Sequence, residues 1–184
     1  METIVRPATA EDIPELRALI QASVNHLQAT DYTESQRQFA LGGIFGVDPL
    51  MIEDRTYFVA VSDSRISASG GWSRRATPFG SDSSPARDDR MLDPQHNAAK
   101  IRALFVHPSF ARHGLGSLIL NTCEAAAKAA GFRRTELTAT LTGVKLFRVR
   151  GYEPVEEILL PLSNGENLPV IRMTKQLPAM DTAH

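Results

Sequence analysis

The sequence predicts an α/β (α+β) fold in which a mixed central sheet is flanked by helices. Short apolar runs typical of buried strands recur along the chain, as in residues 57–61 and 101–106. Other stretches repeat apolar residues every three or four positions, which is the period of an amphipathic helix. The length of 184 residues fits one domain at roughly 150 residues per domain, so we expect a single domain over 1–184.

The first third of the chain contains two expected helices and one strand. Residues 4–7 form a short strand that ends at a proline. Thr9 is then a plausible helix cap before acidic residues, and an apolar stripe follows over 13–27. A second helix is expected from Thr33 to about residue 45, because glycines follow and would close it.

The middle of the chain contains strands, an irregular segment and a long helix. Residues 57–61 and 66–72 are predicted to form a hairpin. The segment 74–98 is rich in Ser, Asp, Pro and Arg without apolar periodicity, so we interpret it as an inserted loop near a substrate site. A strand over 101–106 and a helix from Leu115 to about Gly131 come next.

The last part of the chain completes the sheet. Residues 135–139 are a strand and 143–150 a short helix. Two further strands, 155–162 and 168–174, are joined through Asn164-Gly165, a strong hairpin signal. The expected order is therefore βααββ, insertion, βαβαββ.

Composition and charge exclude several classes of function. The formal charge is −1, whereas proteins that bind nucleic acid electrostatically carry a basic excess. One cysteine allows neither an internal disulfide nor a multi-cysteine zinc site, so we expect no metal. No apolar run reaches the roughly 18 residues that a membrane span needs, and no signal-peptide core is present. We expect a cytoplasmic protein that binds neither nucleic acid nor membrane.

The motif that indicates chemistry lies at the junction of a strand and a helix, over residues 106–117. Gly114 and Gly116 stand at the start of the long helix, where backbone N–H groups lack intrahelical partners and the dipole attracts anions. Glycine lets the backbone approach a phosphate closely, and Arg112 and His113 can add side-chain donors. The pattern favours a diphosphate site, although a tight turn with no ligand remains an alternative.

Other phosphate loops fit this segment less well. The lysine and hydroxyl pair of a P-loop is missing, which argues against ATP or GTP. A dinucleotide-binding fingerprint needs a third glycine, and this chain has Ile119 at that position. The fingerprint also belongs near the start of a parallel sheet, whereas this segment lies past the middle of the chain.

The sequence resembles the GCN5-related N-acetyltransferase (GNAT) family. The resemblance rests on the strand Arg102-Ala103-Leu104-Phe105-Val106-His107-Pro108 and the glycine loop after it. Farther on, Leu146-Phe147-Arg148-Val149-Arg150-Gly151-Tyr152 is similar to the family's Phe-Tyr-x-x-x-Gly-Phe segment, and the element order fits over nearly the whole chain. The resemblance implies the acyl-CoA N-acyltransferase fold and acetyl-CoA as co-substrate.

The resemblance also implies which residues hold that co-substrate. Backbone groups of the fourth strand would hold the pantetheine arm, loop amides would bind the pyrophosphate, and one side chain would pack against the acetyl group. These are Leu104, Phe105, Val106, Arg112, His113, Gly114, Leu115, Gly116, Ser117 and Phe147. The chain departs from the family at Ala111, where glutamine or arginine is usual.

The catalytic residues are unknown from the sequence. Phe147 occupies the position where many members have a tyrosine general acid, and Lys100 stands where a glutamate base is often found. Tyr152 is a weak substitute acid, and Glu136 is a weak candidate for the base. Asp93 and His96 in the insertion are further candidates for the base. A bound water remains an equal alternative.

The function that the resemblance implies is transfer of an acetyl group from acetyl-CoA to a primary amine by direct attack. The acceptor would be a small-molecule or peptide amine, and residues His26, Asp31 and Tyr32 fall where the family often builds its acceptor site. A backbone N–H of Phe105 or Val106 would stabilise the oxyanion. A catalytically weakened CoA-binding sensor or interaction module is the alternative, and a homodimer is possible.

Overall fold

The structure is a computed structural model that describes residues 2–179. It contains one seven-stranded sheet in the order β1-β2-β3-β4-β5-β7-β6. All neighbouring strands are antiparallel except β4 and β5, which are parallel. The strands are β1 (Thr3–Pro7), β2 (Tyr57–Ser62), β3 (Arg65–Ser73), β4 (Ala99–Val106), β5 (Arg134–Thr140), β6 (Glu153–Pro161) and β7 (Asn167–Gln176). The mixed sheet confirms the predicted fold class.

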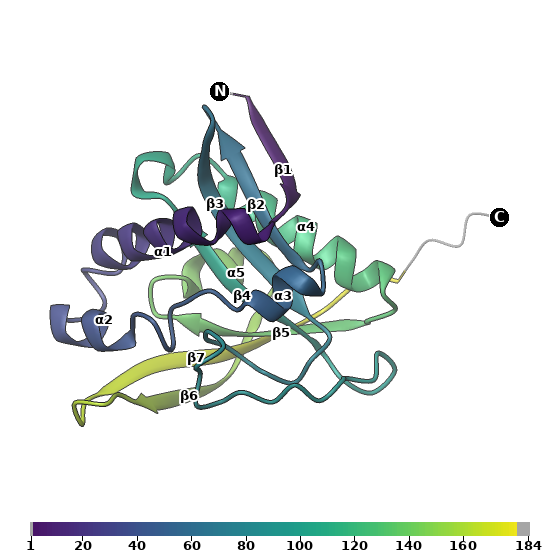
Figure 1. Ribbon diagram of the computed structural model, residues 1–184. Coiled ribbons are helices and arrows are strands. Elements are labelled where there is room, and N and C mark those ends of the chain that lie inside the picture. The colour runs from purple at the N-terminus through teal and green to yellow at the C-terminus, as the bar shows by residue number, and fades with distance from the viewer. Residues whose placement is uncertain (1, 180–184) are drawn as a thin grey trace.

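Helices cover both faces of this sheet (Figure 1). The helices are α1 (Ile13–Leu27), α2 (Glu34–Ala40), α3 (Pro49–Glu53), α4 (Leu115–Ala129) and α5 (Val144–Val149), with short 3₁₀ turns η1 (Ala10–Asp12) and η2 (Pro108–Phe110). One apolar core joins α1 and α3 to the sheet through Leu16, Leu19 and Met51. A second core on the other face joins α4 and α5 through Ile119 and Phe147. The sheet therefore lies between two apolar layers.

Two adjacent glycines let helices from both sides approach β3 closely. A Cβ on Gly70 would lie 2.5 Å from Cγ2 of Ile119 in α4, and one on Gly71 would lie 2.2 Å from Cε of Met51 in α3. No side chain fits at such distances without displacing its neighbours. Gly70-Gly71 therefore sets how near α3 and α4 lie to the middle of the sheet.

The segment between α1 and β2 differs from the sequence prediction. The expected helix from Thr33 to about residue 45 ends at Ala40, because Leu41 is extended (φ −63°, ψ 136°) and Gly42 takes a left-handed φ of 93°. The sequence reasoning also missed α3, whose N-cap Asp48 accepts a hydrogen bond from the Leu50 N–H. Asp followed by Pro at the first helical position was the available signal.

The inserted segment 74–98 is held against the rest of the fold by hydrogen bonds. Its two arms run antiparallel, with the Leu92 N–H donating to the Arg74 carbonyl and the Ala76 N–H to the Arg90 carbonyl. Its tip reaches the segment after α2, where the Ser81 N–H donates to the Gly43 carbonyl at 2.9 Å. The insertion therefore packs beside the end of α2, on the face of the sheet that α1 and α3 cover.

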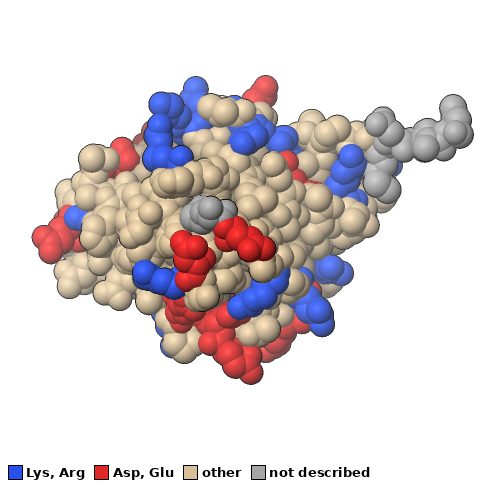
Figure 2. Space-filling model, turned by 90° about the horizontal axis from the view of Figure 1, so that it is seen from above, with Lys and Arg blue, Asp and Glu red and all other residues tan. Residues whose placement is uncertain are grey.

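The surface carries both signs of charge. Figure 2 shows acidic and basic side chains interspersed on the face seen from above, with apolar and neutral residues between them. Among residues 2–179, no helix is both long enough and apolar enough to cross a bilayer.

Candidate active site

The site begins where two parallel strands separate. β4 and β5 pair only from Ala99 with Thr135 to Ile101 with Leu137. Beyond Ile101 the backbone of β4 stays paired with β3 on its other edge, and Ala103 takes a left-handed φ of 56° at an irregularity in that pairing. The β4 edge that faces β5 is thus unpaired from Arg102 onward, and a cavity of about 670 Å³ opens beside it.

The loop after β4 forms one end of this cavity. His107 and Pro108 stop the strand, and the Ser109 N–H donates to His107 Nδ1 at 3.1 Å. Arg112 and Gly114 both have left-handed φ angles, 67° and 79°, and they turn the chain into the first turn of α4. The N–H groups of that turn have no intrahelical partners, so this end of the cavity attracts an anion.

The two glycines of the loop leave room for a diphosphate. A Cβ built on Gly114 meets no atom within 4 Å, and one on Gly116 meets only the side chains of Leu146 and Val106. The open backbone edge of β4 leads directly into this turn and offers N–H and C=O groups to the amides of a pantetheine arm. The geometry therefore fits CoA.

Nine of the ten residues expected to bind CoA line this cavity. They are Leu104, Phe105, Val106, Arg112, Gly114, Leu115, Gly116, Ser117 and Phe147. His113 is exposed and does not line it, because Nδ1 of its ring hydrogen-bonds to the carbonyls of Phe110 and Ala111 within the loop.

Phe147 and Tyr152 lie edge to face, with ring centroids 5.8 Å apart. Phe147 faces the cavity, whereas Tyr152 does not line it. The Tyr152 hydroxyl donates to Glu124 at 2.9 Å and hydrogen-bonds Thr135 at 2.8 Å. Burial raises the pKa of Tyr152 well above its ordinary value, which holds the proton on the phenol. The contacts of Tyr152 are those of a core residue.

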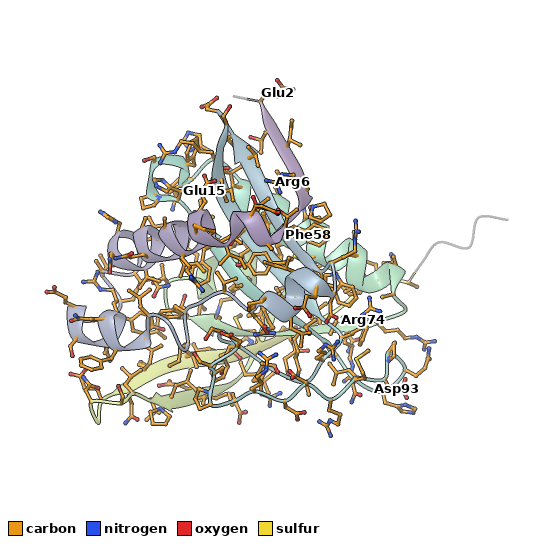
Figure 3. All side chains as sticks on the ribbon, viewed as in Figure 1. Glu2, Arg6, Glu15, Phe58, Arg74 and Asp93 are labelled. Carbon is orange, nitrogen blue, oxygen red and sulfur yellow. The ribbon has the colours of Figure 1, made fainter. Side chains whose placement is uncertain are left out.

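The three carboxylate and histidine candidates lie outside the cavity. Glu136 forms ion pairs with Lys100 and Arg172 on the sheet surface. Burial would raise the pKa of Glu136, but the hydrogen bonds from these two cations outweigh it and lower the pKa. Asp93 and His96 form an exposed pair in the insertion, at 2.7 Å. Figure 3 places Asp93 at the outer edge of the molecule, below the end of α4.

The other half of the cavity contains residues that sequence reasoning did not select. His26, Asp31 and Tyr32 fall where the family often builds its acceptor site, and none of them lines the cavity. The Tyr32 hydroxyl instead donates to the Pro169 carbonyl at 2.6 Å and accepts from the Leu141 N–H at 2.9 Å. We refer to the half of the cavity away from the glycine loop as the acceptor half, after the role proposed for it. Its lining consists of Ser23, Leu27, Gln28, Ile44, Phe45, Gly46, Pro78, Phe79, Gly80 and Arg102.

Arg102 is a buried cation in this half of the cavity. Its Nη1 donates to Asp48 Oδ2 at 2.9 Å and its Nη2 to the Gly80 carbonyl at 2.6 Å. Asp48 also pairs with Arg87 of the insertion, at 3.2 Å. Burial lowers the pKa of Arg102, against the opposing effect of Asp48. A charged residue within an otherwise apolar strand was the sequence signal that could have identified this position.

The cavity lacks the side chains that usually transfer protons. Within residues 2–179, its lining includes no Asp, Glu, His, Cys or Tyr; the ionisable groups there are Arg102, Arg112 and Lys145. The described part of the chain also contains no cluster of three or more His, Cys, Asp or Glu side chains arranged to hold a metal ion.

Solved structures with the same fold include several acetyltransferases. The chain superposes with TM-score 0.73 on a GCN5-related N-acetyltransferase from Rhodopseudomonas palustris, at 22% identity over 96% of this chain and 97% of that one. It superposes with TM-score 0.67 on the PaiA N-acetyltransferase from Thermoplasma acidophilum in complex with coenzyme A, at 14% identity over 96% and 100%. A third, yncA from Salmonella typhimurium with its cofactor acetyl-CoA, gives TM-score 0.62 at 14% identity over 100% of this chain and 99% of that one.

The sequence comparison agrees with the fold. The profile of the acetyltransferase (GNAT) family matches residues 20–152. No curated protein matches the sequence. The family match over this fold identifies the protein as an acyltransferase. The chain belongs to the acetyltransferase (GNAT) family.

Proposed function

We propose that the protein is an acetyl-CoA-dependent N-acetyltransferase that moves an acetyl group directly to a primary amine. The observation that supports this most strongly is the continuity of one cavity. It runs from the first turn of α4, along the unpaired edge of β4, to the half lined by Gln28 and Arg102. Both substrates can therefore meet beside the same strand without a covalent enzyme intermediate.

The backbone of the loop and of β4 would bind the co-substrate. The amides at the start of α4 suit the diphosphate, and the free edge of β4 suits the pantetheine arm. Two solved relatives of this fold hold coenzyme A or acetyl-CoA, which supports the same ligand here. The one cysteine, Cys123, is buried and free, which fits the cytoplasmic location expected from the sequence.

The strand geometry favours Val106 over Phe105 as the oxyanion donor. The His107 N–H donates to the Ser67 carbonyl, so it points toward β3. Backbone N–H groups alternate between the two edges of a strand, which directs the Val106 N–H toward the cavity. A donor held rigidly in this way stabilises charge on the carbonyl oxygen as the amine adds.

Proton transfer does not require a side-chain base in this scheme. The amine nitrogen bonds to the acetyl carbon, the carbon–sulfur bond breaks, and CoA leaves as a thiolate. The cation of Arg102 disfavours a protonated amine nearby, so the acceptor reacts as the free base. After the amine has added, its nitrogen releases one proton to water and keeps the other in the amide. The pH dependence of kcat/KM should then follow the pKa of the acceptor amine.

The direct test is to incubate the purified protein with acetyl-CoA and a panel of amines, and to measure free thiol and acetylated product. Amine-dependent thiol release with a matching product mass is the expected result. CoA binding by calorimetry without release above background for any amine would overturn the proposal. That result would favour the alternative, a CoA-binding sensor or interaction module.

A further inference from the structure

We propose that the acceptor is an amine that carries a carboxylate on an apolar body, and that Arg102 and Gln28 recognise the carboxylate. This inference rests on the proposed function and specifies its substrate class. Both residues line the acceptor half of the cavity, and each is 5% exposed. They come from different elements, Gln28 from the end of α1 and Arg102 from β4.

Each of these side chains has a buried polar atom without a hydrogen-bond partner among the described residues. Two of the three nitrogens of Arg102 are engaged by Asp48 and Gly80, but Nε is not. Oε1 of Gln28 is likewise unpaired. An unpaired buried donor is unfavourable, so a carboxylate that accepts a hydrogen bond from Arg102 Nε gains affinity. The Gln28 amide can turn to present its NH₂ group as a second donor.

The charges in this half of the cavity favour an anion. Asp48 is shared between two arginines, Arg102 and Arg87. Arg87 also pairs with Asp89, whose side chain is 49% exposed, so solvent screens the charge of Asp89. No acidic side chain of residues 2–179 lines the cavity. A substrate with a second ammonium group would therefore meet Arg102 and no carboxylate in the cavity lining, whereas a substrate carboxylate meets a cation and hydrogen-bond donors.

The remaining walls of the acceptor half suit an apolar body. Phe45 and Phe79 line it from the segment after α2 and from the insertion, and Phe45 packs edge to face on Phe105, 6.1 Å between centroids. Leu27 and Ile44 add aliphatic surface. Such a wall favours an apolar substrate, because contact removes apolar surface from water. An apolar amino acid has both features that these walls and donors would recognise.

Matched substrate triplets test this proposal. Phenylalanine, phenylalaninamide and phenethylamine share one apolar body and differ only in the group beside the amine; leucine, leucinamide and isoamylamine form a second triplet. Values of kcat/KM are compared at equal concentrations of free amine, because the three amines titrate differently. The carboxylate member of each triplet should be preferred by at least about tenfold. An equal or greater value for the amide or the simple amine would overturn the proposal.

A negative charge introduced at Gln28 tests the assigned residue. Gln28→Glu should reduce the preference for carboxylate over amide by at least about tenfold relative to Gln28→Met, which removes the amide without adding charge. The KM for acetyl-CoA reports whether the CoA half is intact in both variants. An unchanged preference in Gln28→Glu would exclude this side chain from carboxylate recognition. Failure of the proposed function is distinguishable, since then no member of either triplet releases thiol although CoA binds.

Discussion

Arg102 and Asp48 form a buried ion pair, 2.9 Å from Nη1 to Oδ2, between residues 54 positions apart in the sequence. Their side chains are only 2% and 3% exposed. Asp48 also caps α3, and Arg102 also binds the Gly80 carbonyl of the insertion. This one pair therefore joins β4, α3 and the insertion around the acceptor half of the cavity.

Breaking this ion pair should destabilise the fold strongly. Asp48→Leu leaves the buried charge of Arg102 uncompensated, which costs about 3–5 kcal/mol in the free energy of unfolding. Arg102→Met should cost less, because Asp48 keeps its ion pair with Arg87. The double variant removes both charges and should lose much less than the sum. Denaturant unfolding measures all three. The exposed pair Arg172–Glu156 is the matched control, and Glu156→Gln should cost no more than about 1 kcal/mol. Additive losses in the double variant would show that the two charges do not compensate each other.

Phe147→Tyr should raise turnover several-fold. Phe147 faces the cavity at the position where a phenol can donate a proton to the leaving thiolate. The thiol-release assay at saturating substrates gives kcat directly. Phe147→Leu is the control, since it changes packing without adding a donor and should not raise kcat. Equal kcat for Phe147→Tyr and the parent would mean that the thiolate leaves without help from this position.

Gly116→Ala should weaken CoA binding about tenfold, a loss of about 1.4 kcal/mol in binding free energy. The new Cβ lies 3.1 Å from Cδ2 of Leu146, a side chain that can move, so the folded chain accepts it. The methyl group instead occupies the approach of the diphosphate to the first turn of α4. Calorimetry with CoA measures the change. Gly114→Ala is the comparison, because its φ of 79° adds backbone strain and should lower the melting temperature as well. Unchanged affinity in Gly116→Ala would contradict the diphosphate site.

The stability of the protein should fall in acid partly through Glu136. Burial acts to raise the pKa of this carboxyl, but hydrogen bonds from Lys100 and Arg172 lower it below the ordinary glutamate value. A carboxyl with a lowered pKa in the folded state stabilises the fold fully above about pH 4.3, and this contribution is lost as the pH falls further. Thermal unfolding should therefore depend less on pH below this value in Glu136→Gln than in the parent. Glu157→Gln, at an exposed position of β6, should keep the parent's slope. Equal slopes in the parent and Glu136→Gln would show that this ion cluster does not contribute.

The elements that were predicted well depend on local signals. The long helix from Leu115 was recognisable from its apolar spacing, and it ends at Ala129, two residues before Gly131, which has a φ of 94°. The hairpin of β6 and β7 turns at Asn164-Gly165, where Gly165 has a φ of 87°. Both features arise from residues close in sequence, so their conformational preferences can be read directly.

The expected helix over residues 33–45 was wrong beyond Ala40, for a reason other than local helix propensity. Ile44 and Phe45 line the cavity and pack against the core. They reach these positions because the chain leaves the helix after Ala40. The glycines that were expected to close the helix instead form the turn itself, with the Gly42 N–H donating to the Phe45 carbonyl at 2.8 Å.

The sequence by itself determined the order of the strands and of every α-helix except α3, together with the family resemblance and the glycine loop, because each depends on neighbouring residues. Only the tertiary structure decided which side chains surround the acceptor. Gln28, Phe79 and Arg102 lie far apart in the chain, and they line one cavity because β4 separates from β5 and the insertion folds back toward α2. The tertiary structure also placed Glu136 and Tyr152 in polar contacts away from that cavity. These contacts depend on pairing between strands that are distant in the sequence, and local sequence patterns do not encode such pairing.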